Sequence, residues 1–483
     1  MVDLTRDTAS HLVAELRAGR LSSRELLDAQ LVQFERWNPA VNAVVATNIE
    51  RARAEAVAAD EAFVRGGPTG LLHGLPMTIK DSFETEGIVT TSGALELRDH
   101  MPARDADPVG RLRAAGAIVF GKTNVPLYAG DWQTYNEVHG RTNNPWDTDR
   151  VPGGSSGGAA AAVAPGISPL ELGSDIGGSI RVPAHCCGVF GHKPTQGLVP
   201  DRGHIPGPSG TIAPPDLGVR GPLGRSVDDL AMAMEVLLSA GMRDAPGTLP
   251  APRRHAADRP RVVVYLDDAL CPLGSEVRRV LEAAVAAFAA AGAQLVEASV
   301  PPMSDTHRLY QRLLTAVTSA GLPTHVIDEM ARIAVDPGHP FHAQAADYGL
   351  SHRDWLVADE GRHHLRARWS SDVFAVADVV LAPIAPVPAF VHDSDKPFGM
   401  RTIDVDGTPR DYDQVMLPWA GFATLPGLPA TAVPVGRTAG GLPVGVQVIG
   451  PRWGDLTCLA AARLLERATG GFVPPPWTPA VST

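Results

Sequence analysis

Gly153-Gly-Ser-Ser-Gly-Gly158 and Gly173-Ser-Asp-Ile-Gly-Gly-Ser179 are the two stretches on which the interpretation of this chain depends. An alanine-rich run from residue 159 and a short apolar run at 167–172 separate them, which is typical of a helix and a buried segment. Each stretch by itself is most often a surface turn, and the first also fits an anion site at a helix N-terminus. Together they place serine hydroxyls beside glycines, a pattern that favours a nucleophile.

A serine nucleophile needs a base, and it needs donors for the oxyanion that forms when it attacks a carbonyl. The run Ile176-Gly177-Gly178-Ser179 offers backbone N–H groups in a segment that glycine lets turn freely. Lys80 is a candidate base because it ends the apolar stretch Gly74-Leu-Pro-Met-Thr-Ile-Lys80, where burial would lower its pKa. The alternatives are a lysine at the surface end of a strand or an ion-pair partner of Asp81.

These stretches, with Cys187-Gly-Val-Phe-Gly-His-Lys193 downstream, resemble the amidase signature family over roughly residues 5–475. The resemblance implies an α/β fold with a large mixed, mostly parallel twisted sheet flanked by helices. It implies an amidase that acts on linear amides by acyl transfer, with a small-molecule amide-type substrate and neither cofactor nor metal. In that mechanism Ser179 attacks, and Ser155, after a cis peptide bond from Gly154, relays the proton to a neutral Lys80.

The same resemblance assigns further residues to the site. It implies an oxyanion hole formed by the N–H groups of Ile176, Gly177, Gly178 and Ser179. It also implies that Ser156, Asp175 and Arg181 organise the site from behind.

Two shorter motifs suggest other chemistry, and their context argues against both. Residues 116–123 match the P-loop pattern GxxxxGK[ST], but the four middle residues Ala-Ile-Val-Phe favour a buried strand over a phosphate-binding loop. Residues 153–157 match the GxSxG nucleophile elbow, which must follow a central strand. Residues 144–152 contain two prolines and several polar side chains, which disfavour such a strand.

Composition narrows the class of protein. The chain has 42 basic and 53 acidic residues, a formal net charge of −11, which argues against a nucleic-acid partner. Four cysteines without a CxxC motif disfavour a disulfide framework or a zinc site. The charged, amphipathic N-terminal stretch does not resemble a signal peptide, and no apolar run is long enough for a membrane helix. We expect a cytoplasmic monomer or homodimer that does not span a membrane.

The order of apolar and polar runs predicts the domain organisation. Residues 1–65 show helical spacing and form an expected N-terminal helical segment. From residue 66 to 483, short apolar runs alternate with helical stretches, which indicates one α/β domain. Residues 300–375 are rich in helical patterns and are a candidate for a separate helical cap.

The substrate is the least determined feature. Leu127 and Trp132-Gln133 stand where family members that release ammonia from glutamine carry an acid and a polar run, which disfavours the amidotransferase role. The other alternative is a catalytically silent binding protein on the same scaffold. Aromatic and apolar side chains favour aryl or other hydrophobic amides, carbamates or esters, although each could equally belong to the core. The candidate pocket walls are Leu127, Tyr128, Ala129, Gly130, Trp132 and Trp419.

Overall fold

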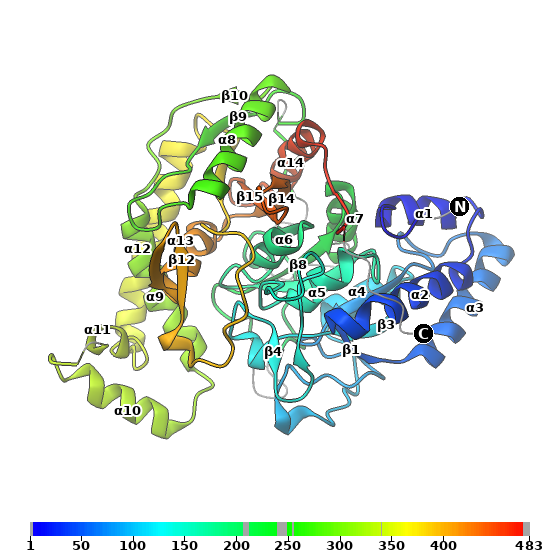
Figure 1. Ribbon diagram of the computed structural model, residues 1–483, viewed down its shortest axis with the longest axis horizontal. Helices are drawn as coiled ribbons and strands as arrows, with labels where there is room; N and C mark the ends of the chain where they lie inside the picture. Colours follow the sequence, from blue (N-terminus) through cyan, green and yellow to red (C-terminus); the bar gives the residue numbers. More distant parts are fainter. Residues whose placement is uncertain (1–2, 206–211, 239–248, 254–255, 340, 477–483) are drawn as a thin grey trace.

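The structure, a computed structural model, describes residues 3–205, 212–238, 249–253, 256–339 and 341–476 (Figure 1). A mixed sheet of 11 strands runs through these residues in the order β1-β3-β2-β6-β8-β7-β14-β15-β11-β9-β10. The strands of this sheet are β1 (Val44–Thr47), β2 (Pro76–Lys80), β3 (Ile118–Thr123), β6 (Glu171–Asp175), β7 (Phe190–Lys193), β8 (Val219–Gly224), β9 (Arg261–Val264), β10 (Gln294–Leu295), β11 (Val379–Pro383), β14 (Ala430–Arg437) and β15 (Pro443–Ile449).

Helices flank this sheet, as the sequence predicts. Two short hairpins, β4 (Tyr135–Asn136) with β5 (Gly140–Arg141) and β12 (Thr402–Val405) with β13 (Thr408–Asp411), lie outside it. The helices are α1 (Ala9–Arg17), α2 (Ser23–Val41), α3 (Ile49–Gly66), α4 (Asp107–Ala114), α5 (Gly157–Val163), α6 (Arg181–Cys187), α7 (Val227–Leu238), α8 (Ser275–Ala290), α9 (Met303–Ser319), α10 (Thr324–Ala334), α11 (His342–Ala345), α12 (His352–Arg368), α13 (Tyr412–Thr424) and α14 (Asp455–Thr469).

The sheet is mixed as expected, but the prediction that it is mostly parallel is wrong. Within the described residues, the pairs β3–β2, β2–β6, β11–β9 and β9–β10 are parallel, and the other six neighbouring pairs are antiparallel. A short apolar run has the same sequence signature in either direction, so the pattern predicts a buried strand without its orientation.

Local sequence explains where the helices begin. Thr8 caps α1 by accepting a hydrogen bond from the backbone N–H of His11. Ser22 and Glu25 form a capping box at the start of α2, which satisfies two backbone donors at once. Buried apolar residues of α8 recur at a helical spacing, which seats one face of that helix against the body of the protein.

The N-terminal segment is not purely helical, which corrects the prediction for residues 1–65. Between α2 and α3 it contributes β1, an edge strand that pairs antiparallel with β3. Val44 lies opposite Thr123 in that pair, so this segment is part of the main sheet. Four residues are too few to show a strand period between two long helical patterns, which is why the strand escaped the sequence analysis.

Residues 300–375 form four helices with unequal packing. Helix α9 packs against both α12 and α13, whereas α10 has no buried residue and lies with α11 at the periphery (Figure 1). The helical content is confirmed, and the division of the chain into a domain and a cap stays a prediction. Among the described residues, none of the helices combines the length and apolar character needed to cross a bilayer.

The structure also bears on the two rejected motifs. The P-loop match at residues 116–123 contains β3, whose residues are all buried, and the amine of Lys122 points to Thr85 and Thr90 rather than to a phosphate loop. The GxSxG match at 153–157 follows residues 144–152, which contain no strand. Both motifs therefore lack the structural context that their chemistry requires.

Candidate active site

The candidate site lies where neighbouring strands of the sheet end. Lys80 is the last residue of β2, and Asp175 is the last residue of β6, the parallel neighbour of β2. Because parallel strands end at the same edge of a sheet, the two side chains come from one edge. Ser155 precedes α5 and Ser179 precedes α6, and these two helices pack against each other.

Lys80 is fully buried and contacts the first predicted serine. Its Nζ lies 2.7 Å from Ser155 Oγ and 2.9 Å from Ser174 Oγ. The cis peptide bond between Gly154 and Ser155 is present, as the family resemblance implies. Neither alternative for Lys80 holds, because its amine does not reach the surface and Asp81 pairs instead with Lys122 and His139.

Burial sets the protonation of Lys80. Removal of the amine from water lowers its pKa to about 7, and the positive charge of Arg220 adds to this shift. The carboxyl groups of Asp175 and Glu171 act in the opposite direction with a smaller effect. Near neutral pH a large fraction of Lys80 is therefore uncharged, the state in which it can accept a proton.

Asp175 and Arg181 form a buried ion pair that organises the Ser179 loop. The Asp175 carboxylate accepts hydrogen bonds from the backbone N–H groups of Gly178 (2.9 Å) and Ile180 (3.1 Å), and Arg181 binds both of its oxygens. Burial by itself would raise the pKa of Asp175, but Arg181 and these donors lower it to about 2. The carboxylate therefore stays charged and holds the loop in one shape.

Ser156 joins the loops of the two serines. Its backbone N–H donates to the carbonyl oxygen of Ser179 at 3.1 Å, and its hydroxyl lies 3.3 Å from the carbonyl oxygen of Ser174. The hydroxyl of Ser179 itself makes no hydrogen bond within the described residues. The structure thus brings Lys80 and Ser155 into direct contact, and it connects Ser179 to them through the backbone of Ser156.

The predicted oxyanion hole has three open donors rather than four. Gly178 donates its N–H to Asp175, which corrects the expectation that this group faces a substrate. In the described part of the chain, the N–H groups of Ile176, Gly177 and Ser179 have no partner. Gly178 also has φ +90°, in the left-handed region that favours glycine, which explains the residue type at this bend.

The six predicted pocket residues fall into different places. The indole N–H of Trp132 donates to the Gly177 carbonyl at 2.7 Å, so this ring lies against the Ser179 loop. Leu127 is 54% exposed, and Tyr128, which is followed by Ala129 and Gly130, turns its hydroxyl to Glu96.

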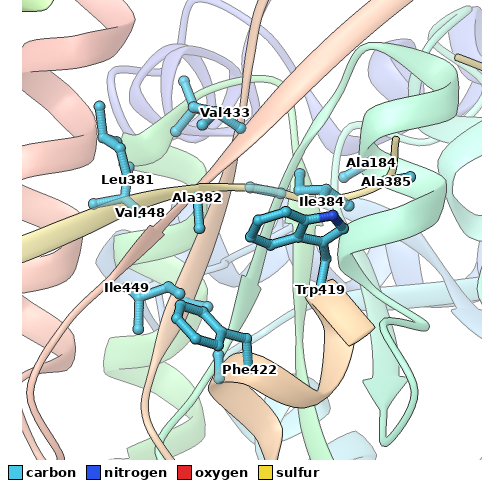
Figure 2. Packing of buried hydrophobic residues seen from close by; sticks show 14 of the residues in the cluster. Ala184, Leu381, Ala382, Ile384, Ala385, Trp419, Phe422, Val433, Val448 and Ile449 are labelled. Atoms are coloured by element: carbon cyan, nitrogen blue, oxygen red, sulfur yellow. The ribbon is translucent and has the colours of Figure 1, made fainter. Parts of the chain in front are cut away.

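Trp419 is the clear correction among these residues. Its side chain has no exposed surface, and its indole N–H donates to the Cys271 carbonyl at 3.1 Å. Figure 2 shows it on α13 next to Phe422, in the core cluster that also contains Ile449. Trp419 is therefore a core residue, because the helical face that carries it points into the sheet and not toward the Ser179 loop.

Three residues near the site escaped the sequence analysis. Tyr310 of α9 donates its hydroxyl to the carbonyl oxygen of Ile176 at 2.6 Å, and Leu417 of α13 lies close to Gly177. Ser174, which contacts Lys80, also lies 2.9 Å from His204 Nε2. Ser174 stands inside the second glycine- and serine-rich stretch and could have been noticed, but Tyr310 lies in a helical pattern with no local signal.

No metal ligand set emerges from the described residues. Among them there is no group of three or more His, Cys, Asp or Glu side chains arranged to hold a metal ion. All four cysteines are buried and none of them forms a disulfide.

Comparison with known proteins assigns the chain to a family. The family model described as Amidase matches residues 25–459. The chain belongs to the amidase family. This amidase is 34% identical over 480 residues to indoleacetamide hydrolase of Bradyrhizobium diazoefficiens, a match that covers 96% of this chain and 86% of that protein. It is also 34% identical over 492 residues to a glutamyl-tRNA(Gln) amidotransferase subunit of Synechococcus sp. (strain CC9605), with 96% of each chain covered.

Solved structures agree with this assignment. A bacterial aryl acylamidase of the amidase signature enzymes family superposes on this amidase with a TM-score of 0.79 at 27% identity, and the match covers 96% of each chain. The predicted amidase signature fold and the predicted enzyme class, an amide hydrolase, are confirmed.

Proposed function

We propose that this amidase cleaves carboxylic amides through an acyl-enzyme on Ser179, with Ser155 and Lys80 as its proton relay. The observation that carries the proposal is the 2.7 Å contact between Ser155 and the fully buried amine of Lys80. A lysine whose pKa is lowered to about 7 by burial is a base matched to neutral pH. The open N–H groups of Gly177 and Ser179 supply donors for the developing oxyanion.

The proton follows the new bond through two half-reactions. As the Oγ of Ser179 bonds to the substrate carbonyl carbon, its proton moves to Ser155, whose own proton moves to the neutral amine of Lys80. The relay then returns this proton to the leaving nitrogen as the C–N bond breaks, which leaves an acyl ester on Ser179. Water attacks that ester, gives its proton to the same relay, and releases the acid and the Ser179 hydroxyl.

For the substrate we propose an aryl or otherwise hydrophobic amide, with related carbamates and esters as further substrates. A methyl group added to Gly177 would meet Tyr310, Trp132 and Leu417 at 3.7–3.9 Å, so apolar side chains surround the loop that carries the donors. Flat aromatic walls favour flat apolar groups. The names indoleacetamide hydrolase and aryl acylamidase, carried by two similar proteins, agree with an aromatic group near the reacting amide.

The second candidate is a glutamine-hydrolysing amidotransferase subunit, because several similar proteins carry that name at equal identity. Leu127 and Trp132-Gln133 count against it, since an exposed apolar side chain and a buried indole replace the acidic and polar groups expected near a glutamine. A silent binding protein is the third candidate. We further propose a cytoplasmic monomer or homodimer that acts without a partner protein.

A hydrolysis screen tests the proposal. Wild-type protein and Ser179→Ala are compared on anilides, aliphatic amides, carbamates, esters and glutamine, and both are exposed to a fluorophosphonate probe. We expect anilide hydrolysis to fall by at least ~10³-fold in Ser179→Ala, as removal of a nucleophile usually causes. Labelling should be lost in that variant as well. A variant that keeps wild-type turnover would refute the nucleophile, and glutamine as the best substrate would favour the second candidate.

A further inference from the structure

Two peptide groups of the Ser179 loop are held from behind by side chains that lie far away in the sequence. The carbonyl oxygen of Ile176 accepts the hydroxyl of Tyr310 at 2.6 Å, and the carbonyl oxygen of Gly177 accepts the indole N–H of Trp132 at 2.7 Å. In a trans peptide the carbonyl and the next N–H point in opposite directions. A contact that holds the Ile176 carbonyl therefore also sets the direction of the Gly177 N–H.

The two peptides differ in how many contacts hold them. The peptide between Gly177 and Gly178 is held at both ends, because Trp132 binds its oxygen and Asp175 binds its N–H. The peptide between Ile176 and Gly177 is held at its oxygen by Tyr310, and in the described chain its N–H has no partner. The peptide with the open donor therefore depends on a single hydrogen bond.

Tyr310 is built to make this contact. Its side chain has no exposed surface, and α9, which carries it, packs against α12 and α13. Its ring lies so close to Gly421 of α13 that a Cβ at that glycine would stand 2.3 Å from the ring. Burial raises the pKa of Tyr310, and the charge of Asp175 raises it further, so the hydroxyl stays protonated and can only donate to the carbonyl.

We propose that Tyr310 is a positioning residue that aims the Gly177 N–H at the substrate oxyanion by holding the Ile176 carbonyl. The inference rests on the proposed function and adds helix α9, from the predicted helical cap, to the catalytic apparatus. An oxyanion is stabilised only by donors that are already oriented when charge develops. Loss of the hydroxyl therefore weakens the transition state and leaves ground-state binding nearly unchanged.

The variant Tyr310→Phe tests this, because it removes one oxygen and keeps the ring against Gly421. We expect kcat for an anilide to fall about 10- to 100-fold with KM within twofold, less than the ~10²–10³-fold cost of deleting a donor. A trifluoromethyl ketone matched to the substrate should lose inhibition by the same factor. The corresponding carbinol, which forms no oxyanion, should bind as before. Gly421→Ala, whose methyl displaces the ring, is a second variant with the same expected direction.

Tyr265→Phe is the matched control, since its hydroxyl donates to Asp268 and its ring packs on Phe422, away from the Ser179 loop. Equal losses for the ketone and the carbinol in Tyr310→Phe, unchanged ketone inhibition, or an equal loss in Tyr265→Phe would each overturn the inference. Ser179→Ala, measured in parallel, separates the two levels. If that variant is inactive and Tyr310→Phe matches wild type, only the positioning role fails. If Ser179→Ala stays active, the proposed function fails.

Discussion

The protonation of Lys80 should set the acid side of the pH–rate profile of this amidase. With a pKa of about 7, the neutral fraction of Lys80 is about one-half at pH 7, a tenth at pH 6 and a hundredth at pH 5. An unperturbed lysine would be neutral in fewer than about one molecule in a thousand at pH 7. We therefore expect kcat/KM to fall about tenfold for each pH unit below ~6, because only the neutral amine accepts the relayed proton.

The assay is kcat/KM for an anilide between pH 5 and 9, with controls for other buried groups that titrate in the same range. Burial raises the pKa of Glu171 to about 7 and lowers that of Lys193 to about 7. The variants Glu171→Gln and Lys193→Met should keep the acid limb, whereas Lys80→Met should lose at least ~10³-fold of the rate and show no limb in what remains. A profile that is flat to pH 5, or a limb that disappears in Glu171→Gln, would refute the assignment.

The same proton links Lys80 to stability. Its folded pKa lies below the ordinary lysine value of 10.5, so between about pH 7 and 10.5 the unfolded chain holds a proton that the folded chain lacks. The free energy of unfolding should rise with pH over that interval, by up to about 5 kcal/mol from this group. Urea unfolding of Lys80→Met should show a slope against pH that is smaller by one proton, and an unchanged slope would contradict a buried neutral amine.

Three further substitutions test the site in other ways. Arg181→Met leaves the carboxylate of Asp175 buried without its cation, so urea unfolding should show a loss of about 3–5 kcal/mol, and wild-type stability would contradict the ion pair. Gly158→Ala places a Cβ 2.4 Å from the backbone nitrogen of Asn124, so we expect a loss of about 1–3 kcal/mol, and an unchanged melting temperature would exclude this close approach. Gly177→Ala adds a methyl group at ordinary contact distances, so the fold should persist while KM for bulky anilides rises, and equal KM values for small and bulky substrates would exclude that wall of the pocket.

Much of the fold could be predicted from residue patterns. Helices were expected near residues 108–115, 275–291 and 456–468, and the structure has α4, α8 and α14 at these places. Each carries a regular apolar spacing over at least two turns, which is a strong local signal. The direction of the strands and the short edge strand β1 could not be predicted, because pairing partners are chosen by the whole chain and not by a window of sequence.

The candidate site divides in the same way. Lys80 at the end of a buried strand, and the two serine loops, were evident because glycine, serine and a strand-terminal lysine are local features. Trp419 was misplaced, since an indole has the same local pattern on a pocket wall and in a core. Tyr310 was missed because its function depends on one hydrogen bond to Ile176, which no periodicity reveals.

By itself, the sequence determined the residue types at the site, the backbone freedom of the Gly177 and Gly178 turn, and an α/β chain long enough to bury them. Only the tertiary structure decided that the amine of Lys80 is dry and faces Ser155, and that Gly178 is engaged by Asp175 while Gly177 stays open. The physical reason is that pKa values and donor directions depend on desolvation and on contacts between distant segments. Those contacts exist only once the sheet and helices have packed.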